Sequence, residues 1–107
     1  MAGEVERRAK LALDAIRKAY GTEAGEFSTT MFVGHHLEEL PQDYWQEHTG
    51  TDAPNPAAVL ELLELKSNWG DDDIENFDFS LPGDVTNYVL SVSFDDAGEI
   101  DDISMES

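Results

Sequence analysis

At residues 77–84 the chain reads Phe-Asp-Phe-Ser-Leu-Pro-Gly-Asp, in which apolar and polar side chains alternate up to a Pro-Gly pair. Alternation with a period of two places Phe77, Phe79 and Leu81 on one face of a β-strand. Pro and Gly in the central positions of the following turn are typical of type II, which requires a positive φ angle at Gly83. The sequence therefore predicts a half-buried strand that ends in a tight turn.

Two more strands are predicted toward the C-terminus, at 88–94 and 99–105. The turn between them, at 95–98, places Gly98 in the left-handed position. One face of the first of these strands is apolar: Tyr88, Leu90, Val92 and Phe94. In the last strand the alternation breaks, and a bulge at Asp101-Asp102 returns the apolar residues to one side: Ile100, Ile103 and Met105.

Upstream of the strands the apolar period changes to that of helices. Residues 3–20 have apolar side chains at spacings of three and four, followed by Gly21 where a left-handed cap is common. Residues 31–40 favour a second helix, although 27–33 are also rich in strand formers, so helix and strand both stay open there. Residues 41–48, with Pro near the first turn, predict a short third helix.

A fourth helix is predicted to begin at Asn55, a good N-cap residue, with Pro56 at the first helical position. A broad apolar surface follows over 57–65, and Trp69-Gly70 is expected to close the helix. These patterns predict one α+β domain over residues 1–107, in which three or four N-terminal helices pack on a small C-terminal antiparallel β-meander.

Composition excludes several classes of function. The 107 residues include no cysteine, which removes disulfides, thiol catalysis and thiolate zinc sites. Six Lys and Arg residues against 24 acids leave a net charge of -18, which argues against direct binding of nucleic acid. No apolar run approaches the ~20 residues that span a bilayer, and the first residues lack a signal peptide's pattern, so a cytoplasmic protein is expected.

The charges are unevenly distributed along the chain. Residues 1–20 hold five of the six cations, whereas residues 67–107 carry twelve acids and no cation. A surface of one sign of charge indicates a cationic partner, metal ions or solubility alone. Attraction between the basic first helix and the acidic strands is a further interpretation, although exposed pairs contribute only about 0–1 kcal/mol each.

Several of these segments together resemble a family of small acidic bacterial proteins catalogued only as a domain of unknown function. The resemblance covers nearly the whole chain and implies a bacterial cytoplasmic single domain, but it assigns no role to any residue. The segments that carry it are Phe32-Val33-Gly34-His35-His36-Leu37-Glu38-Glu39-Leu40, Tyr44-Trp45, the Leu-rich helix up to Trp69, Phe77-Asp78-Phe79-Ser80-Leu81-Pro82-Gly83, Tyr88-Val89 and Ile103-Ser104-Met105-Glu106-Ser107.

One candidate metal site is the segment 35–39, where His35 and His36 lie three or four residues before Glu39 on a predicted helix. An imidazole and this carboxylate face the same side of a helix, and His48 or an Asp can complete a site. A metal-dependent enzyme that uses these residues is the alternative hypothesis. Adjacent His residues point about 100° apart, however, so a buried His36 beside leucines is the competing interpretation.

The acidic turns at 71–75 and 95–99 supply clustered carboxylates, which are ligands for hard cations. The residue order of an EF-hand is absent, so weak divalent cation binding is the most that these turns predict. A solvated acidic turn explains the same residues.

The preferred hypothesis is a binding module for a basic protein, of the immunity-protein, antitoxin or inhibitor type. Candidate anchors on such a surface are Tyr44, Trp45 and Trp69, each of which also fits a core position, together with Asp71, Asp72 and Asp73. No nucleophile motif or phosphate-binding loop supports an enzyme. Oligomeric state is left open by the sequence.

Overall fold

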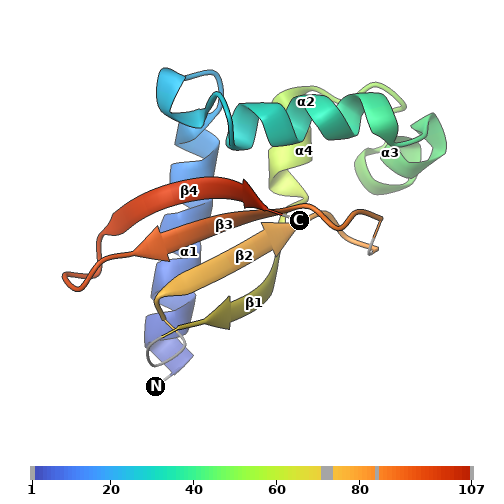
Figure 1. Ribbon diagram of the computed structural model, residues 1–107. Coiled ribbons are helices and arrows are strands. Elements are labelled where there is room, and N and C mark those ends of the chain that lie inside the picture. The colour runs from blue at the N-terminus through green and yellow to red at the C-terminus, as the bar shows by residue number, and fades with distance from the viewer. Residues whose placement is uncertain (1, 71–73, 84, 107) are drawn as a thin grey trace.

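The protein is described by a computed structural model over residues 2–70, 74–83 and 85–106 (Figure 1). Four α-helices and a 3-10 turn precede four strands: α1 (Ala2–Ala19), η1 (Glu23–Gly25), α2 (Thr29–Glu39), α3 (Gln42–Thr49), α4 (Pro56–Glu61), β1 (Glu64–Trp69), β2 (Asn76–Ser80), β3 (Val89–Phe94) and β4 (Ile100–Glu106). Each strand pairs antiparallel with the next, in the order β1-β2-β3-β4. The predicted α+β class, with helices before an antiparallel meander, is confirmed.

The prediction of one helix from Asn55 to Trp69 is wrong in its second half. The helix begins as expected, because Asn55 Oδ1 accepts a hydrogen bond of 2.9 Å from the backbone N–H of Ala58. It ends after six residues, and Glu64–Trp69 forms β1, a fourth strand that the sequence analysis missed. A short apolar run fits a helix or a strand equally well, and here pairing with β2 selects the strand.

The bulge predicted in the last strand is present. In the ladder between β3 and β4, Ser93 lies opposite Asp102 and Phe94 lies opposite Ile100, which leaves Asp101 as the extra residue. Apolar partners then meet along the whole ladder, because the bulge corrects the alternation: Phe94 with Ile100, Val92 with Ile103, and Leu90 with Met105.

The segment that fits both helix and strand by sequence is helical from Thr29. Its buried residues recur at helical spacing and face the core: Thr29, Phe32, Val33 and His36. Positive φ angles occur where the turns require them, 86° at Gly83 and 81° at Gly98. Asp84, the last residue of the predicted type II turn, lies outside the described residues.

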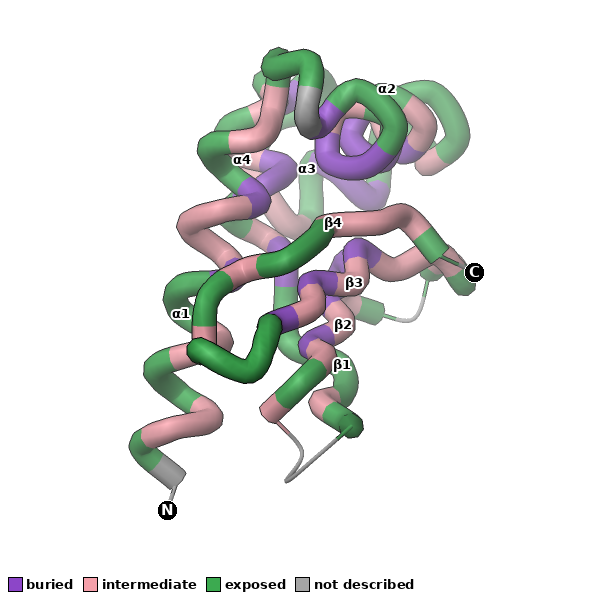
Figure 2. Tube along the Cα trace, turned by 60° about the vertical axis from the view of Figure 1, so that its left-hand side comes forward, coloured by how far each residue is buried: buried purple, intermediate pink, exposed green. Residues whose placement is uncertain are grey.

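The hydrophobic core lies between one face of the sheet and the helices (Figure 2). In both views α1 runs along this inner face, and α2 lies beyond β4. The core residues of the sheet are Phe77, Phe79, Leu90, Val92 and Phe94, and those of the helices include Ala12, Ile16, Phe32, Val33, Trp45, Val59 and Leu60.

The opposite face of the sheet has no helix of the described chain over it (Figure 1). Most side chains on this outer face are polar, as alternation in a half-buried strand requires, and Trp69 and Val89 are the apolar exceptions. None of the described helices combines the length and the apolar character needed to cross a bilayer.

Candidate functional site

Trp69 is the large aromatic residue of the open sheet face. It ends β1, and half of its surface, 50%, is exposed. The indole Nε1 donates a hydrogen bond of 3.1 Å to Oδ2 of Asp78 on the neighbouring strand. The hydroxyl of Ser67 donates a second bond of 3.1 Å to the same oxygen. The ring is therefore held in one orientation while much of its surface remains free to contact a partner.

Asp78 places a negative charge beside this ring. Its bonds to Trp69 and Ser67 come from neutral groups, and no ion pair to it occurs among the described residues. Its other oxygen, Oδ1, is buried and has no hydrogen-bond partner within residues 2–70, 74–83 and 85–106. A cation above the indole would be attracted by both the π face and the adjacent carboxylate.

The strands next to Trp69 present a flat polar surface. Two rows of paired residues cross the sheet on this face: Ser67, Asp78, Ser91 and Ser104 in one, and Trp69, Asn76, Ser93 and Asp102 in the other. Because serine and asparagine side chains are short, the indole is the bulkiest group on this surface. This arrangement favours contact with a partner through stacking on the indole and hydrogen bonds to the polar rows.

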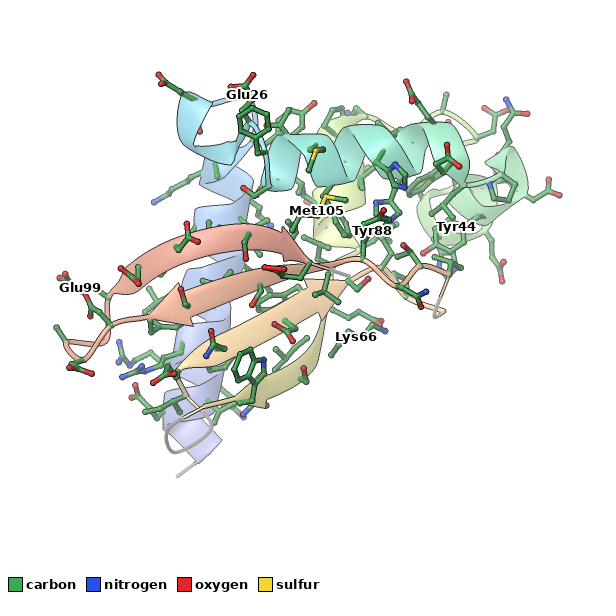
Figure 3. The ribbon with its side chains drawn as sticks, in the orientation of Figure 1. Glu26, Tyr44, Lys66, Tyr88, Glu99 and Met105 are labelled. Atoms are coloured by element: carbon green, nitrogen blue, oxygen red, sulfur yellow. The ribbon has the colours of Figure 1, made fainter. Side chains whose placement is uncertain are left out.

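Exposed carboxylates surround the far side of this face. They lie in the β3–β4 turn, where Figure 3 labels Glu99, and along β4, and comprise Asp95, Asp96, Glu99, Asp101, Asp102 and Glu106. On the sheet itself Lys66 is the one cation, and its Nζ pairs with Glu64 at 3.3 Å. The open face is therefore acidic, and the field around it attracts cations.

Lys66 also affects the edge of the sheet. The register between β1 and β2 shifts between Leu65 and Ser67, so Lys66 occupies an irregularity in the edge strand. A charged side chain and a bulge on an edge strand both oppose pairing with a strand from another chain. The β1 edge is therefore protected against pairing with another strand, whereas the outer face of the sheet stays open.

The other two predicted aromatic anchors belong to the interior. Tyr44 and Trp45 are both buried, and the Tyr44 hydroxyl donates a 2.8 Å hydrogen bond to the backbone oxygen of Pro82. Burial, followed by the nearby charges of Glu64 and Glu47, raises the pKa of Tyr44 to about 12. The Tyr44 hydrogen bond joins α3 to the β2–β3 connection. Asp71, Asp72 and Asp73, the remaining candidates, lie outside the described residues.

Among the described residues, the candidate metal residues do not come together as one site. The buried ring of His36 donates from Nδ1 to the backbone oxygen of Phe32 at 2.7 Å, and its Nε2 lies 2.9 Å from Thr86 Oγ1. The Nδ1 contact fixes the tautomer because a carbonyl can only accept, so Nε2 accepts from the Thr86 hydroxyl in the neutral ring. Burial lowers the pKa of His36.

The other candidate metal residues are His35, His48 and Glu39. The rings of His35 and Tyr88 meet edge to face with centres 5.1 Å apart, and the ring of His48 lies 4.4 Å from that of Tyr44. Glu39 is exposed. Within the described residues no three His, Asp or Glu side chains are placed to hold a metal ion. The rings of His35 and His36 meet edge to face with centres 5.1 Å apart, and both lie near the Tyr88 ring, but His36 is buried and both of its ring nitrogens form hydrogen bonds.

Two hollows on the described surface lie beside helices. One, of about 510 Å³, lies between α1 and α4 and is lined by Arg17, Tyr20, Asn55, Pro56, Ala57, Leu60 and Glu61. The other, of about 260 Å³, lies at the start of α2 and is lined by Gly21, Thr22, Glu23, Glu26 and Thr30. Neither contains any of the candidate metal or partner-binding residues.

The sequence analysis found Trp69 but missed Asp78, because a single polar residue between Phe77 and Phe79 has the pattern of an ordinary strand. Only the pairing of β1 with β2 brings the two side chains together. Comparison of this chain with protein-family models, curated proteins and solved structures gives no match.

Proposed function

We propose that this protein is a small acidic binding module that engages a basic protein, in the manner of an immunity protein, antitoxin or inhibitor. The observation that supports this best is the indole of Trp69, half exposed and held by Asp78 on an open, acidic sheet face. A partner arginine would stack on the indole and gain from the nearby carboxylate. The surrounding acids would speed association and make it sensitive to salt.

The proposed contact has the parts of an interface hot spot. Trp is among the residues that contribute most to binding, and a ring fixed before binding loses little conformational entropy. The short neighbouring side chains give hydrogen-bonding groups around the anchor. A like-charged copy of this chain would be repelled, which favours a cationic partner of a different kind.

The proposal is tested by capture from a lysate of the organism that makes the protein, followed by titration of the purified partner. We expect one basic protein at about 0.15 M salt and weaker capture at higher salt. Trp69→Ala should weaken the measured Kd at least about tenfold, or ~1.4 kcal/mol. Leu11→Ala is the matched control, because Leu11 is an exposed apolar residue on α1, away from the sheet face.

Two further variants separate the ring from its support. Trp69→Phe keeps an aromatic face but removes the Nε1 donor, and Asp78→Asn keeps the shape but removes the charge. Both should weaken binding less than Trp69→Ala does. The proposal is wrong if no basic protein is captured, or if the Kd is the same for the wild type and Trp69→Ala.

A further inference from the structure

Two apolar side chains at the start of α2, Phe27 and Met31, are exposed, and no part of the described chain covers them. We call this pair the Phe27–Met31 ridge. Phe27, just before the helix, is 76% exposed, and Met31, one turn later, is 43% exposed. Met31 lies in the first turn of α2, and Phe27 lies two residues before that helix begins at Thr29, so both exposed side chains belong to the same end of α2. Gly34 lies on the same side of the helix as Met31, three residues later, and a Cβ atom there would meet nothing within 4 Å. A partner backbone can therefore approach the ridge closely.

An acidic hollow adjoins this Phe27–Met31 ridge. Two of its lining residues, Glu26 and Thr30, directly precede Phe27 and Met31 in the sequence. Its carboxylates, from Glu23 and Glu26, form no ion pair with any described cation. Figure 3 labels Glu26 at the corner between η1 and α2, on the side of the molecule beyond β4 and far from β1.

We propose that the Phe27–Met31 ridge is a docking site for a cationic amphipathic helix of a partner protein. Apolar side chains of that helix would cover Phe27 and Met31, and a Lys or Arg beside them would enter the hollow between Glu23 and Glu26. Exposed Met adapts to varied apolar partners, and an amphipathic helix presents a row of apolar side chains that can cover both exposed residues. The site goes beyond the proposed function, since it shares no residue with the Trp69 surface.

Charge decides between the occupants of this ridge. A second copy of the chain would add another net charge of -18, and its α2 would bring the same carboxylates to the contact. Like charges across a symmetric interface oppose association, whereas a cationic helix satisfies both the ridge and the hollow. Complementary charge thus favours a basic partner helix over self-association.

The probe is a synthetic peptide of about 18 residues, five helical turns, made of Leu and Lys with Leu recurring every three or four residues. The control peptide has the same composition in scrambled order, so that it keeps the charge but loses the apolar face. Titration of the full chain at about 0.15 M salt, followed by NMR, should give at least tenfold tighter binding of the amphipathic peptide.

Variants locate the contact. Phe27→Ser combined with Met31→Ser should abolish the preference for the amphipathic peptide, and Glu23→Gln with Glu26→Gln should weaken binding of both peptides. Leu11→Ser controls for loss of an exposed apolar side chain elsewhere, and Trp69→Ala should leave the preference unchanged. Because Phe27 and Met31 are exposed, replacing them should not unfold the protein. An unchanged thermal midpoint of each variant checks this.

Three results would overturn this inference. Equal affinity for the two peptides would show that charge alone drives binding. A preference that persists in the Phe27 and Met31 double variant would place the contact elsewhere. Sedimentation as a dimer that the double variant dissociates would make a second copy the occupant. The proposed role of the Trp69 surface is tested separately, by the effect of Trp69→Ala on the Kd for the basic protein captured from the lysate.

Discussion

Nη1 of Arg8 donates a 2.9 Å hydrogen bond to the backbone oxygen of Ile74, which joins α1 to the start of the β2 segment. The guanidinium carbon of Arg8 also lies 5.2 Å from the centre of the Phe94 ring, and the side chain pairs with Glu4. Among the described residues, Arg8 of the basic first helix thus reaches the strands at one carbonyl and one aromatic ring, and its guanidinium also lies beside Gly98 in the β3–β4 turn. The ion pairs of α1, Arg7–Glu4 and Arg8–Glu4, stay within the helix.

Replacing Arg8 should therefore cost more stability than replacing its neighbour. The Arg8 side chain is only 12% exposed, whereas that of Arg7 is 56% exposed and donates its hydrogen bonds to Glu4. We expect Arg8→Ala to lower the free energy of unfolding by about 1.5–3 kcal/mol, through the lost bond and ring contact. Arg7→Ala should change it by less than about 0.5 kcal/mol. Urea denaturation of the two variants measures the difference, and equal values would contradict this role of Arg8.

The buried ring of His36 should make stability depend on pH. Burial lowers its pKa in the folded state below the usual 6.5, so the unfolded chain binds the proton more tightly. The contribution of neutral His36 is therefore complete above pH 6.5 and is lost as the pH falls through this value toward the lower folded pKa. The ring of His36 lies next to the rings of His35, Phe32 and Tyr88. None of these is a carboxylate that would stabilise protonated His36.

Denaturation from about pH 8 to about pH 5.5 checks this, because carboxylates stay ionised over most of that range. The free energy of unfolding of the wild type should fall relative to that of His36→Gln, which lacks the titrating group. Parallel curves for the wild type and His36→Gln would exclude His36 as the source of any pH dependence.

Gly25 is required by a close contact between η1 and the end of α1. A Cβ atom at this position would overlap the backbone oxygen of Ala19, which cannot rotate away as a side chain would. Gly25→Ala should lower the free energy of unfolding by about 1–3 kcal/mol. Gly34→Ala is the matched control, since space is open there and alanine favours the helix by about 1 kcal/mol. Opposite shifts of the denaturation midpoint are expected, and a stable Gly25→Ala would contradict the packing of η1.

The net charge of -18 should make the fold sensitive to ionic strength. Self-repulsion destabilises the compact state, and salt screens it, so Tm should rise between about 0.01 M and 0.3 M NaCl. Calorimetry with a chelator present separates screening from weak divalent cation binding. A further rise in MgCl₂ at equal ionic strength would indicate such binding, whereas a flat or falling Tm in NaCl would argue against uncompensated surface repulsion.

Most helices and the three C-terminal strands were predictable because each carries a local signal. Helix α1 has regular apolar spacing, and Asn55-Pro56 marks the start of α4. The bulge at Asp101 was predictable too, since only an extra residue reconciles the apolar positions of β4 with one buried face. Strand β1 was not, because the run Leu62–Leu65 satisfies either period and its pairing partner is a separate segment.

The candidate site, too, was predictable from the sequence only in part. Local chemistry in the sequence identified Trp69 as an aromatic anchor and His36 as a ring beside leucines, but it could not assign either to the surface or to the core. Tyr44, which bonds to the β2–β3 connection, and Trp45 are both buried and so do not belong to the surface. The exposure of Phe27 and Met31 has no signal in the sequence, where both residues fit the apolar pattern of a helix.

The sequence by itself determined the acidic character of the protein, its cysteine-free chemistry, and the periods that produce helices first and strands last. These properties depend on composition and on neighbours within one turn or one strand. Tertiary structure alone decided that Glu64–Trp69 is a strand, that Asp78 holds Trp69, and that Thr86 meets His36. Each of these depends on contact between residues distant in the chain, and only packing and pairing in three dimensions select them.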